Sequence, residues 1–307
     1  MESLAQGRIT EKAKSPPAAL QALLARIIDY AGLFPPAGSS MSDAVANYAQ
    51  YQASESAWAL GRFVVPANRL AEFEAARSRL PIRQTWQLTC LIGDNLHDDS
   101  LRVHDFNRRS RSIGAAVDSI EIKLGCGDRA QLLRQIPPSD VCVYFEVSLD
   151  EPLEQLAAIN KAGARAKLRT GGVTAEAIPS AEGVTGFLSR CADAGVAFKA
   201  TAGLHHPVRS IHPLTYEPNA PRARMHGFLN VFLAAAFALQ KVPQNEMAAV
   251  LNSENPADFY FDDIGARWRD STLTTDQIRH TRDQFAISFG SCSFEEPLHD
   301  LRDVQIS

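Results

Sequence analysis

The sequence is poor in cysteine, and its cysteines are not arranged to hold a disulfide framework or a structural zinc ion. The chain has 307 residues and five cysteines, which are scattered, odd in number and form no Cys-x-x-Cys pair. This pattern argues against a disulfide-stabilised secreted domain and against a zinc module. We expect them to act as small buried hydrophobic residues. They are Cys90, Cys126, Cys142, Cys191 and Cys292.

The sequence also lacks a long apolar run and an excess of charge of either sign. Its longest apolar stretch, Gly227–Leu239, contains Asn230 and is shorter than the ~20 residues that span a bilayer, so we expect a buried helix there and no membrane partner. The first residues, Met1–Arg8, are polar and lack the apolar core of a signal peptide, which predicts a cytoplasmic protein. The formal net charge of -4 gives no electrostatic reason to expect a nucleic-acid partner.

What the sequence does have is an alternation of short apolar runs with stretches of helical periodicity. This alternation predicts βαβ units and a parallel sheet. About eight such units fit the length, and α/β barrels use roughly 200–250 residues as one domain. We therefore predict a single-domain α/β protein, a (β/α)8 TIM barrel over residues 18–307 that follows a flexible N-terminal arm at 1–17. An open doubly wound sheet is the alternative architecture.

Eight segments are candidates for the barrel strands. The first also fits the end of a preceding helix. Because the eighth is placed before the last helix, we expect the final segment, Phe289–Pro297, to be a loop that packs back on the barrel. The candidate strands are Ile27–Tyr30, Leu60–Val65, Trp86–Ile92, Ser119–Leu124, Val141–Val147, Ala164–Arg169, Val196–Thr201 and a segment near Asp258–Asp262.

Two neighbouring candidate strands carry lysine where buried barrel strands are normally apolar. Lys167 and Arg169 share one face of the sixth strand, and Lys199 and Thr201 share one face of the seventh. Since barrel active sites lie at the C-terminal ends of the strands, these positions predict a site; the alternative is that the first two side chains reach outward to solvent. Two lysines this close would each lower the other's pKa, and burial would act in the same direction. A partly neutral lysine could attack a carbonyl and form a Schiff base.

Acidic residues on the neighbouring strands would balance this positive charge. Glu146 lies in a strongly apolar run, so its burial requires a cationic partner such as Lys167. Glu121 lies on the fourth strand, and Asp29 at the end of the first. For Glu121 and Asp29 a structural ion pair or a helix cap is as good an interpretation as a catalytic role.

Residues after the two lysine strands suit a negatively charged substrate group. Glycines let backbone N–H groups approach an anion, and helix N-termini favour one. The alternative for the basic loop after the seventh strand is a solvated surface. The segment Tyr30–Pro36 is expected to rim the barrel mouth or to brace its bottom. Cys292 is either a reactive thiol or a buried hydrophobic residue. The predicted substrate-binding set is Arg169, Thr170, Gly171, Gly172, Thr201, His205, His206, Arg209, His226 and Asn230.

The segments Lys167–Gly171 and Lys199–Leu204 resemble the deoxyribose-phosphate aldolase group of class I aldolases. That group has a lysine with a Thr-Gly segment on one strand and a second lysine with an Ala/Gly-rich turn on the next. The resemblance implies that Lys167 is the Schiff-base lysine, that Lys199 lowers its pKa, and that a proton-shuttling residue stands at Glu121 or Lys123. The whole-chain pattern also resembles bacterial barrel proteins to which no activity is attached.

Three functions remain open from the sequence. The first is a cofactor-independent, lysine-dependent lyase acting on a small anionic carbonyl compound, with Lys167, Lys199, Glu146 and Glu121 as catalytic residues. The second is a metal-dependent hydrolase or isomerase, in which His205, His206 or His226 and an acid such as Glu146 or Asp29 bind a divalent ion. The third is a non-catalytic barrel that binds a small anionic metabolite. The substrate and the oligomeric state, a homo-oligomer included, stay open.

Overall fold

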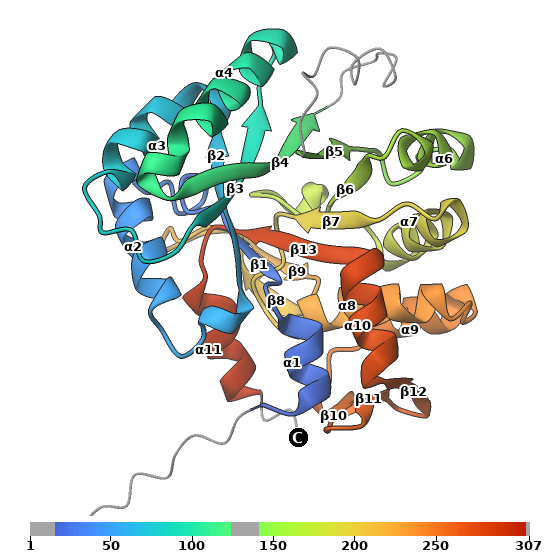
Figure 1. The fold of residues 1–307 in the computed structure, drawn as a ribbon. Helices are drawn as coiled ribbons and strands as arrows, with labels where there is room; N and C mark the ends of the chain where they lie inside the picture. Colours follow the sequence, from blue (N-terminus) through green and yellow to red (C-terminus); the bar gives the residue numbers. More distant parts are fainter. Residues whose placement is uncertain (1–15, 124–140, 305–307) are drawn as a thin grey trace, which may run out of the picture.

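A computed structural model describes residues 16–123 and 141–304 (Figure 1). Eight parallel strands close into a barrel in the order β1-β13-β7-β6-β5-β4-β3-β2, so the predicted TIM barrel is confirmed. Most of the predicted arm at 1–17, together with Cys126, lies outside the described residues. The barrel strands are β1 (Ile28–Tyr30), β2 (Leu60–Pro66), β3 (Trp86–Ile92), β4 (Ala115–Lys123), β5 (Cys142–Glu146), β6 (Arg165–Arg169), β7 (Phe198–Thr201) and β13 (Ala286–Ser291).

Helices surround the barrel in Figure 1, and their ends follow local sequence signals. The side chain of Ser40 accepts a hydrogen bond from the Asp43 amide at the start of α2, as an N-cap serine does. At the end of α7, Gly195 takes a left-handed φ of 64°, which favours glycine. The helices are α1 (Ala18–Leu24), α2 (Met41–Gln52), α3 (Leu70–Arg77), α4 (Leu96–Arg109), α6 (Leu153–Lys161), α7 (Ala181–Ala194), α8 (Phe228–Leu239), α9 (Gln244–Asn252), α10 (Thr275–Gln284) and α11 (Glu295–Asp303).

The predicted eighth strand is wrong. The segment near Asp258–Asp262 forms β10 (Phe259–Phe261), which pairs antiparallel with β11 (Gly265–Trp268), and β11 pairs with β12 (Ser271–Thr274) outside the barrel. Its alternating buried and exposed aromatic residues suit a strand with one solvent-facing side. The strand that closes the barrel is β13, which pairs with both β1 and β7.

The C-terminal segment also differs from the prediction, because it contains the strand that closes the barrel. Phe289–Ser291 belongs to β13, and the chain then enters α11, which begins at Glu295. The expected loop is therefore only the short link between this strand and this helix. The longest apolar stretch of the sequence, Gly227–Leu239, contains α8, which is buried along nearly its whole length as expected. No helix of the described ranges combines the length and the hydropathy needed to cross a bilayer.

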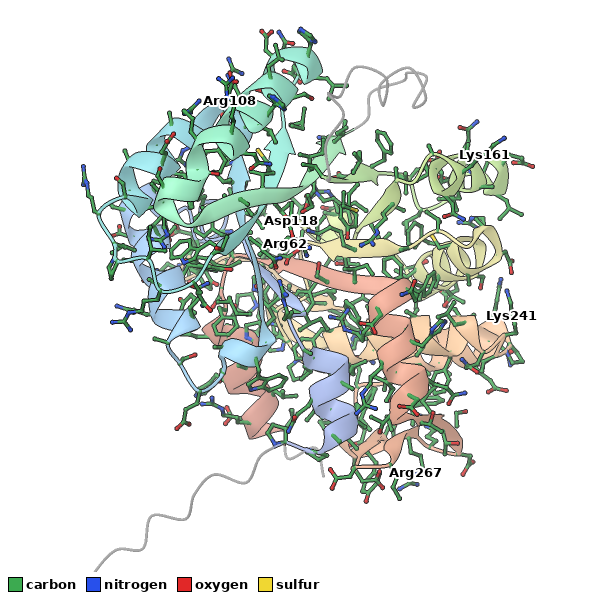
Figure 2. All side chains as sticks on the ribbon, viewed as in Figure 1. Arg62, Arg108, Asp118, Lys161, Lys241 and Arg267 are labelled. Carbon is green, nitrogen blue, oxygen red and sulfur yellow. The ribbon has the colours of Figure 1, made fainter. Side chains whose placement is uncertain are left out.

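The barrel interior is charged, whereas its outer face is apolar and aromatic. Phe63 of β2 packs against Phe73 of α3, with ring centroids 5.3 Å apart. Inside, Arg62 forms an ion pair of 2.7 Å with Asp118 of β4. Figure 2 labels the two residues next to each other among the barrel strands. A buried charge is costly unless it is paired. We therefore expect the charged side chains inside the barrel to have partners of opposite charge.

Candidate active site

A continuous chain of ion pairs runs inside the barrel toward the C-terminal ends of the strands. At its buried end, the Lys199 Nζ of β7 lies 2.6 Å from Asp29 Oδ2 of β1 and 2.6 Å from Glu121 Oε1 of β4. The other oxygen of Glu121 lies 2.6 Å from Lys167 Nζ of β6. The strand register explains the meeting, since Lys167 and Lys199 lie directly opposite each other. The sequence prediction that the two lysines adjoin is therefore correct.

The chain of ion pairs ends at the barrel mouth. Lys167 Nζ also lies 3.1 Å from Glu146 Oε2 of β5, and the guanidinium of Arg169 contacts the same carboxylate at 3.2 Å. Glu146 thus has Lys167 as its cationic partner, as the sequence predicted. Exposure rises along the chain: the side chain of Lys199 is 2% exposed, that of Lys167 7% and that of Arg169 48%.

The acids change the electrostatics that the sequence predicted for this cluster. Burial disfavours the charged form of Lys199, but Asp29 and Glu121 outweigh it, and the pKa of Lys199 is raised above its usual value. The predicted mutual lowering of lysine pKa values is therefore wrong for Lys199. Burial of Glu121 opposes its ionisation, yet the two lysines hold its pKa at about 2. The pKa of Glu146 is likewise lowered, by Lys167 and Arg169 against its burial.

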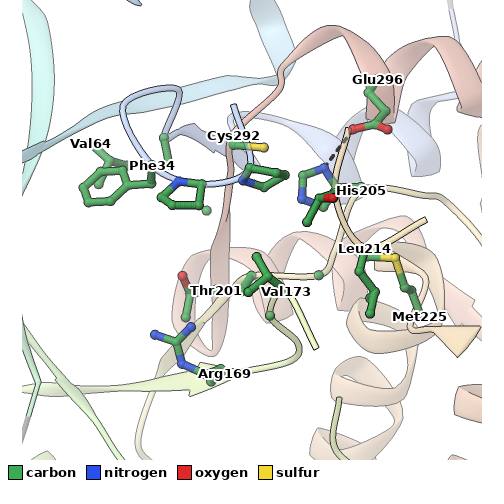
Figure 3. A pocket seen from close by; sticks show the side chains of 18 of the residues that line it. Phe34, Val64, Arg169, Val173, Thr201, His205, Leu214, Met225, Cys292 and Glu296 are labelled. Atoms are coloured by element: carbon green, nitrogen blue, oxygen red, sulfur yellow. Dashed lines mark hydrogen bonds and ion pairs between the residues drawn. The ribbon is translucent and has the colours of Figure 1, made fainter. Parts of the chain in front are cut away.

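A cavity of about 330 Å³ opens at the C-terminal ends of the strands (Figure 3). This volume suits a small ligand. Seven residues of the predicted site line it, while Lys199 lies beneath and does not reach it. Glu146 does not line the cavity itself, but it contacts Lys167 and Arg169, which do. The predicted residues in the lining are Glu121, Lys167, Arg169, Gly172, Thr201, His205 and His206.

Much of the cavity wall is apolar, and the sequence analysis did not assign these residues to a site. Figure 3 shows Phe34 and Val64 on one side, and Leu214 and Met225 on another. Phe34 comes from the loop after β1, so the prediction that Tyr30–Pro36 rims the barrel mouth is confirmed. Leu214 and Met225 come from the antiparallel ribbon of β8 (Ser210–Pro213) and β9 (Arg222–Met225), an excursion between β7 and α8 that the parallel-barrel pattern does not predict.

His205 faces this cavity and is held by an acid of the last helix. Ala202 and Gly203 take left-handed φ values of 58° and 77°, which turn the chain sharply just after β7. His205 Nδ1 then lies 2.9 Å from Glu296 Oε2 of α11. Tyr216 donates a hydrogen bond of 3.1 Å to the same oxygen. Burial opposes the ionisation of Glu296, but His205, His206 and Tyr216 together outweigh it and lower the pKa of Glu296.

His206 diverges from His205, as expected for adjacent residues, and has a separate environment. Its Nδ1 lies 2.5 Å from Asp300 Oδ2, one helical turn after Glu296. Its ring stacks on that of His212, with centroids 3.2 Å apart. Burial lowers the pKa of His206 below its usual value, and the bond to Asp300 only partly offsets this. The pKa of His212 falls to about 4, through burial and the neighbouring His206.

Three of the predicted substrate-binding residues, Arg209, His226 and Asn230, do not line the cavity. Asn230 donates to the carbonyls of Val250 and Ser253 at 2.7 and 2.8 Å, and its oxygen accepts from the Arg209 amide at 2.9 Å. The Nε2 of His226 bonds the Pro179 carbonyl at 2.8 Å. These contacts occupy the side-chain amide of Asn230 and the Nε2 of His226, whereas the guanidinium of Arg209 lies 3.5 Å from His226 Nδ1 and 3.7 Å from Glu254 Oε1.

Thr170 and Gly171 also serve the backbone. Thr170 Oγ1 donates to the Ala202 carbonyl at 2.5 Å, which ties the end of β6 to the turn after β7. A Cβ at Gly171 would lie 3.0 Å from the Gly203 Cα, so the two turns approach closely because neither residue has a side chain. These two residues support the turn that presents His205 and do not line the cavity.

The predicted metal constellation is not assembled in this structure. His205, His206 and His226 bond Glu296, Asp300 and the Pro179 carbonyl separately. Within residues 16–123 and 141–304, the group whose potential ligand atoms lie close enough to share an ion is His299, Asp300 and Asp303 of α11, away from the cavity lining. Cys292 does line the cavity, and burial raises the pKa of its thiol, which opposes the reactive interpretation.

Comparisons with known proteins add little to this geometry. No protein-family model matches the sequence, and no curated protein matches it either. A solved structure of a FabK mutant from Thermotoga maritima aligns over 94% of this chain and 97% of its own, with 11% sequence identity and a TM-score of 0.41. A likeness of this size carries no functional argument. The fold assignment rests on the closed strand order. The resemblance to aldolases is confined to the two segments Lys167–Gly171 and Lys199–Leu204.

Proposed function

We propose that the protein is a lysine-dependent lyase, similar to aldolases, in which Lys167 forms a Schiff base with a small carbonyl compound. The observation that carries the proposal is the position of Lys167. It lines the cavity, and its Nζ lies between two carboxylates, at 2.6 Å from Glu121 and 3.1 Å from Glu146. Lys199, by contrast, has its amine buried between Asp29 and Glu121.

The two carboxylates suit the charge of a Schiff base. Lys167 first gives up a proton to solvent, and the neutral amine attacks the carbonyl carbon. A proton returned from solvent then lets the carbinolamine hydroxyl leave as water, which gives an iminium with the same single positive charge as the original ammonium. Glu121 and Glu146 can therefore stabilise the iminium with the contacts that they make to the ammonium. The iminium accepts the electron pair of a bond that breaks at the neighbouring carbon.

Lys199 has a different role here from the one that the aldolase resemblance implied. Its raised pKa keeps it charged, and it contacts the Glu121 carboxylate from below. It therefore holds Glu121 ionised and in place. We assign the substrate's negative group to the mouth, where the half-exposed Arg169 and the hydroxyl of Thr201 line the cavity.

Trapping with borohydride tests this proposal. The protein is incubated with pyruvate, glyoxylate, acetaldehyde or dihydroxyacetone phosphate, reduced with borohydride, and digested for peptide mass spectrometry. We expect a mass increase on the peptide that contains Lys167 with at least one probe, and none in Lys167→Arg, which keeps the charge but not the nucleophile. The exposed Lys241, paired with Asp193, gives the background level of non-specific modification. An unmodified Lys167 across the panel would favour the anion-binding alternative.

A further inference from the structure

The carboxylates beside Lys167 suit the charge of the proposed Schiff base but are poor bases to act on it. Both carboxylates beside Lys167 have lowered pKa values, because each contacts two cationic side chains. Carboxylates held in this way are weak proton acceptors at neutral pH. A lyase of this type also moves a proton at the substrate carbon or hydroxyl next to the Schiff base. That proton must therefore pass through another group that faces the cavity.

His205 is placed for this task. Its side chain lines the same cavity as Lys167 but comes from the turn after β7 and packs toward α11. Figure 3 shows its ring beneath Glu296, with the hydrogen bond between them. A carboxylate accepts only from an N–H, so Nδ1 carries the proton and Nε2 keeps its lone pair in the neutral ring. Within the described part of the chain, no side chain or carbonyl bonds Nε2.

We propose that His205, oriented by Glu296, is the catalytic base and acid that removes and returns a proton next to the Schiff base. This rests on the proposed function of Lys167. Glu296 is a positioning residue, because it touches the imidazole and acts through it. It is itself fixed, since Tyr216 donates to its Oε2 at 3.1 Å and Ser293 accepts from its backbone amide at 3.1 Å.

The proton transfer balances as follows on a ketone probe. In the iminium of Lys167 and pyruvate, a methyl C–H bond breaks and its proton passes to Nε2 of His205. The electron pair of that bond forms the C=C of an enamine, and the C=N pair returns to nitrogen. The imidazolium is stabilised by the carboxylate of Glu296. In deuterium oxide the imidazolium exchanges its proton with solvent, and the reverse step delivers deuterium to the methyl carbon.

This step gives a direct experiment with pyruvate or whichever ketone of the trapping panel labels Lys167. Loss of the proton NMR signal of the carbon next to the carbonyl is followed in deuterium oxide. We expect His205→Asn to lower the exchange rate by ~100-fold or more, the usual contribution of a general base, with borohydride trapping on Lys167 unchanged. Glu296→Gln should lower it by ~10-fold, as for loss of an orienting carboxylate, and should shift the pH profile. His299→Asn, an exposed residue of the same helix, should change neither.

The outcomes separate this inference from the proposed function. If the wild-type protein gives no adduct on Lys167, the proposed function fails and the inference falls with it. If Lys167 is trapped but exchange is absent, or survives in His205→Asn, only the inference is overturned. A rise in KM with unchanged kcat in His205→Asn would make His205 an anion-binding residue instead. Equal trapping in wild type and variant shows that the variant is folded, and Glu296→Gln tests the same assignment without removing the ring.

Discussion

The two lysines occupy equivalent positions on adjacent strands, yet their surroundings differ. Lys199 is sealed between Asp29 and Glu121, and among the described residues it is the one cation within ion-pair distance of Asp29. Lys167 also contacts two carboxylates, but each of them has a second cation, Lys199 for Glu121 and Arg169 for Glu146. The difference indicates that replacing the buried lysine costs more stability than replacing the lysine at the cavity.

The largest effect is expected from Lys199→Met. Among the described residues, the substitution leaves buried Asp29 with the Ser288 hydroxyl and the Arg62 amide as donors, and it removes one of the two cations beside Glu121. Loss of one partner of a buried ion pair costs about 3–5 kcal/mol. We expect the free energy of unfolding, measured by urea denaturation, to fall by this amount. Adding Asp29→Asn to the variant should recover part of the loss, and no recovery would contradict the pairing.

A smaller effect is expected from acid. A carboxyl whose pKa is lower in the folded protein stabilises the fold above its ordinary pKa, and this contribution is lost as the pH falls toward the folded value. For Glu121 that window runs from its usual value of 4.5 down to about 2. The loss should be on the order of 2 kcal/mol, seen as a steeper fall of unfolding free energy below pH 4.5 in wild type than in Glu121→Gln. Parallel curves for the two proteins would show that Glu121 is not held ionised.

Lys167→Met should cost less than its counterpart on β7. Each acid that it leaves still has one cation within contact distance, so we expect a loss of roughly 1–2 kcal/mol, below that for breaking a fully buried pair. Urea denaturation of Lys167→Met and Lys199→Met side by side provides the matched comparison. Equal losses would remove the distinction between the two lysines.

The smallest effect on stability is expected at the barrel mouth. Arg169→Gln breaks a half-exposed ion pair, which contributes ~0.5 kcal/mol or less after solvent screening. Because Arg169 also lowers the pKa of Glu146, that pKa should rise in the variant. The change can be followed by carbon NMR of the carboxyl groups. A larger loss of unfolding free energy would indicate that the ion-pair chain is cooperative through to its exposed end.

Sequence reasoning reached the barrel because strand period, helix caps and apolar runs are local signals. It misplaced the eighth strand, since the aromatic run of Phe259–Phe261 is a stronger strand signal than Ala286–Ser291. The latter contains small residues where it faces the crowded interior: Ser288 bonds Asp29 and Gly290 lies beside Thr201. Local strand propensity does not reveal the need for small residues here, because that need arises from neighbours that are distant in the chain.

The sequence predicted the part of the candidate site that depends on adjacent strands, and not the part that depends on residues distant in the chain. The neighbouring lysines and Glu146 follow from the order of adjacent strands. The raised pKa of Lys199 does not, since it depends on Asp29, 170 positions away in sequence. Glu296 and Tyr216 come from α11 and from the excursion after β7, and no sequence spacing relates them to His205. The sequence instead predicted binding roles for Arg209, His226 and Asn230, which do not line the cavity.

Closure of the barrel by β13 has a consequence for how the protein folds. This strand lies between β1 and β7, so it joins the first barrel strand to the seventh, and Asp29 of β1 and Lys199 of β7 meet across it. Before Ala286–Ser291 has left the ribosome, β1 and β7 are open sheet edges, which are sites for non-native pairing and aggregation. The buried charges of the half-built barrel would then lie in water. Protein synthesis must therefore run through the last strand before the barrel can close around the lysine cluster, and this late, long-range closure should make folding slow.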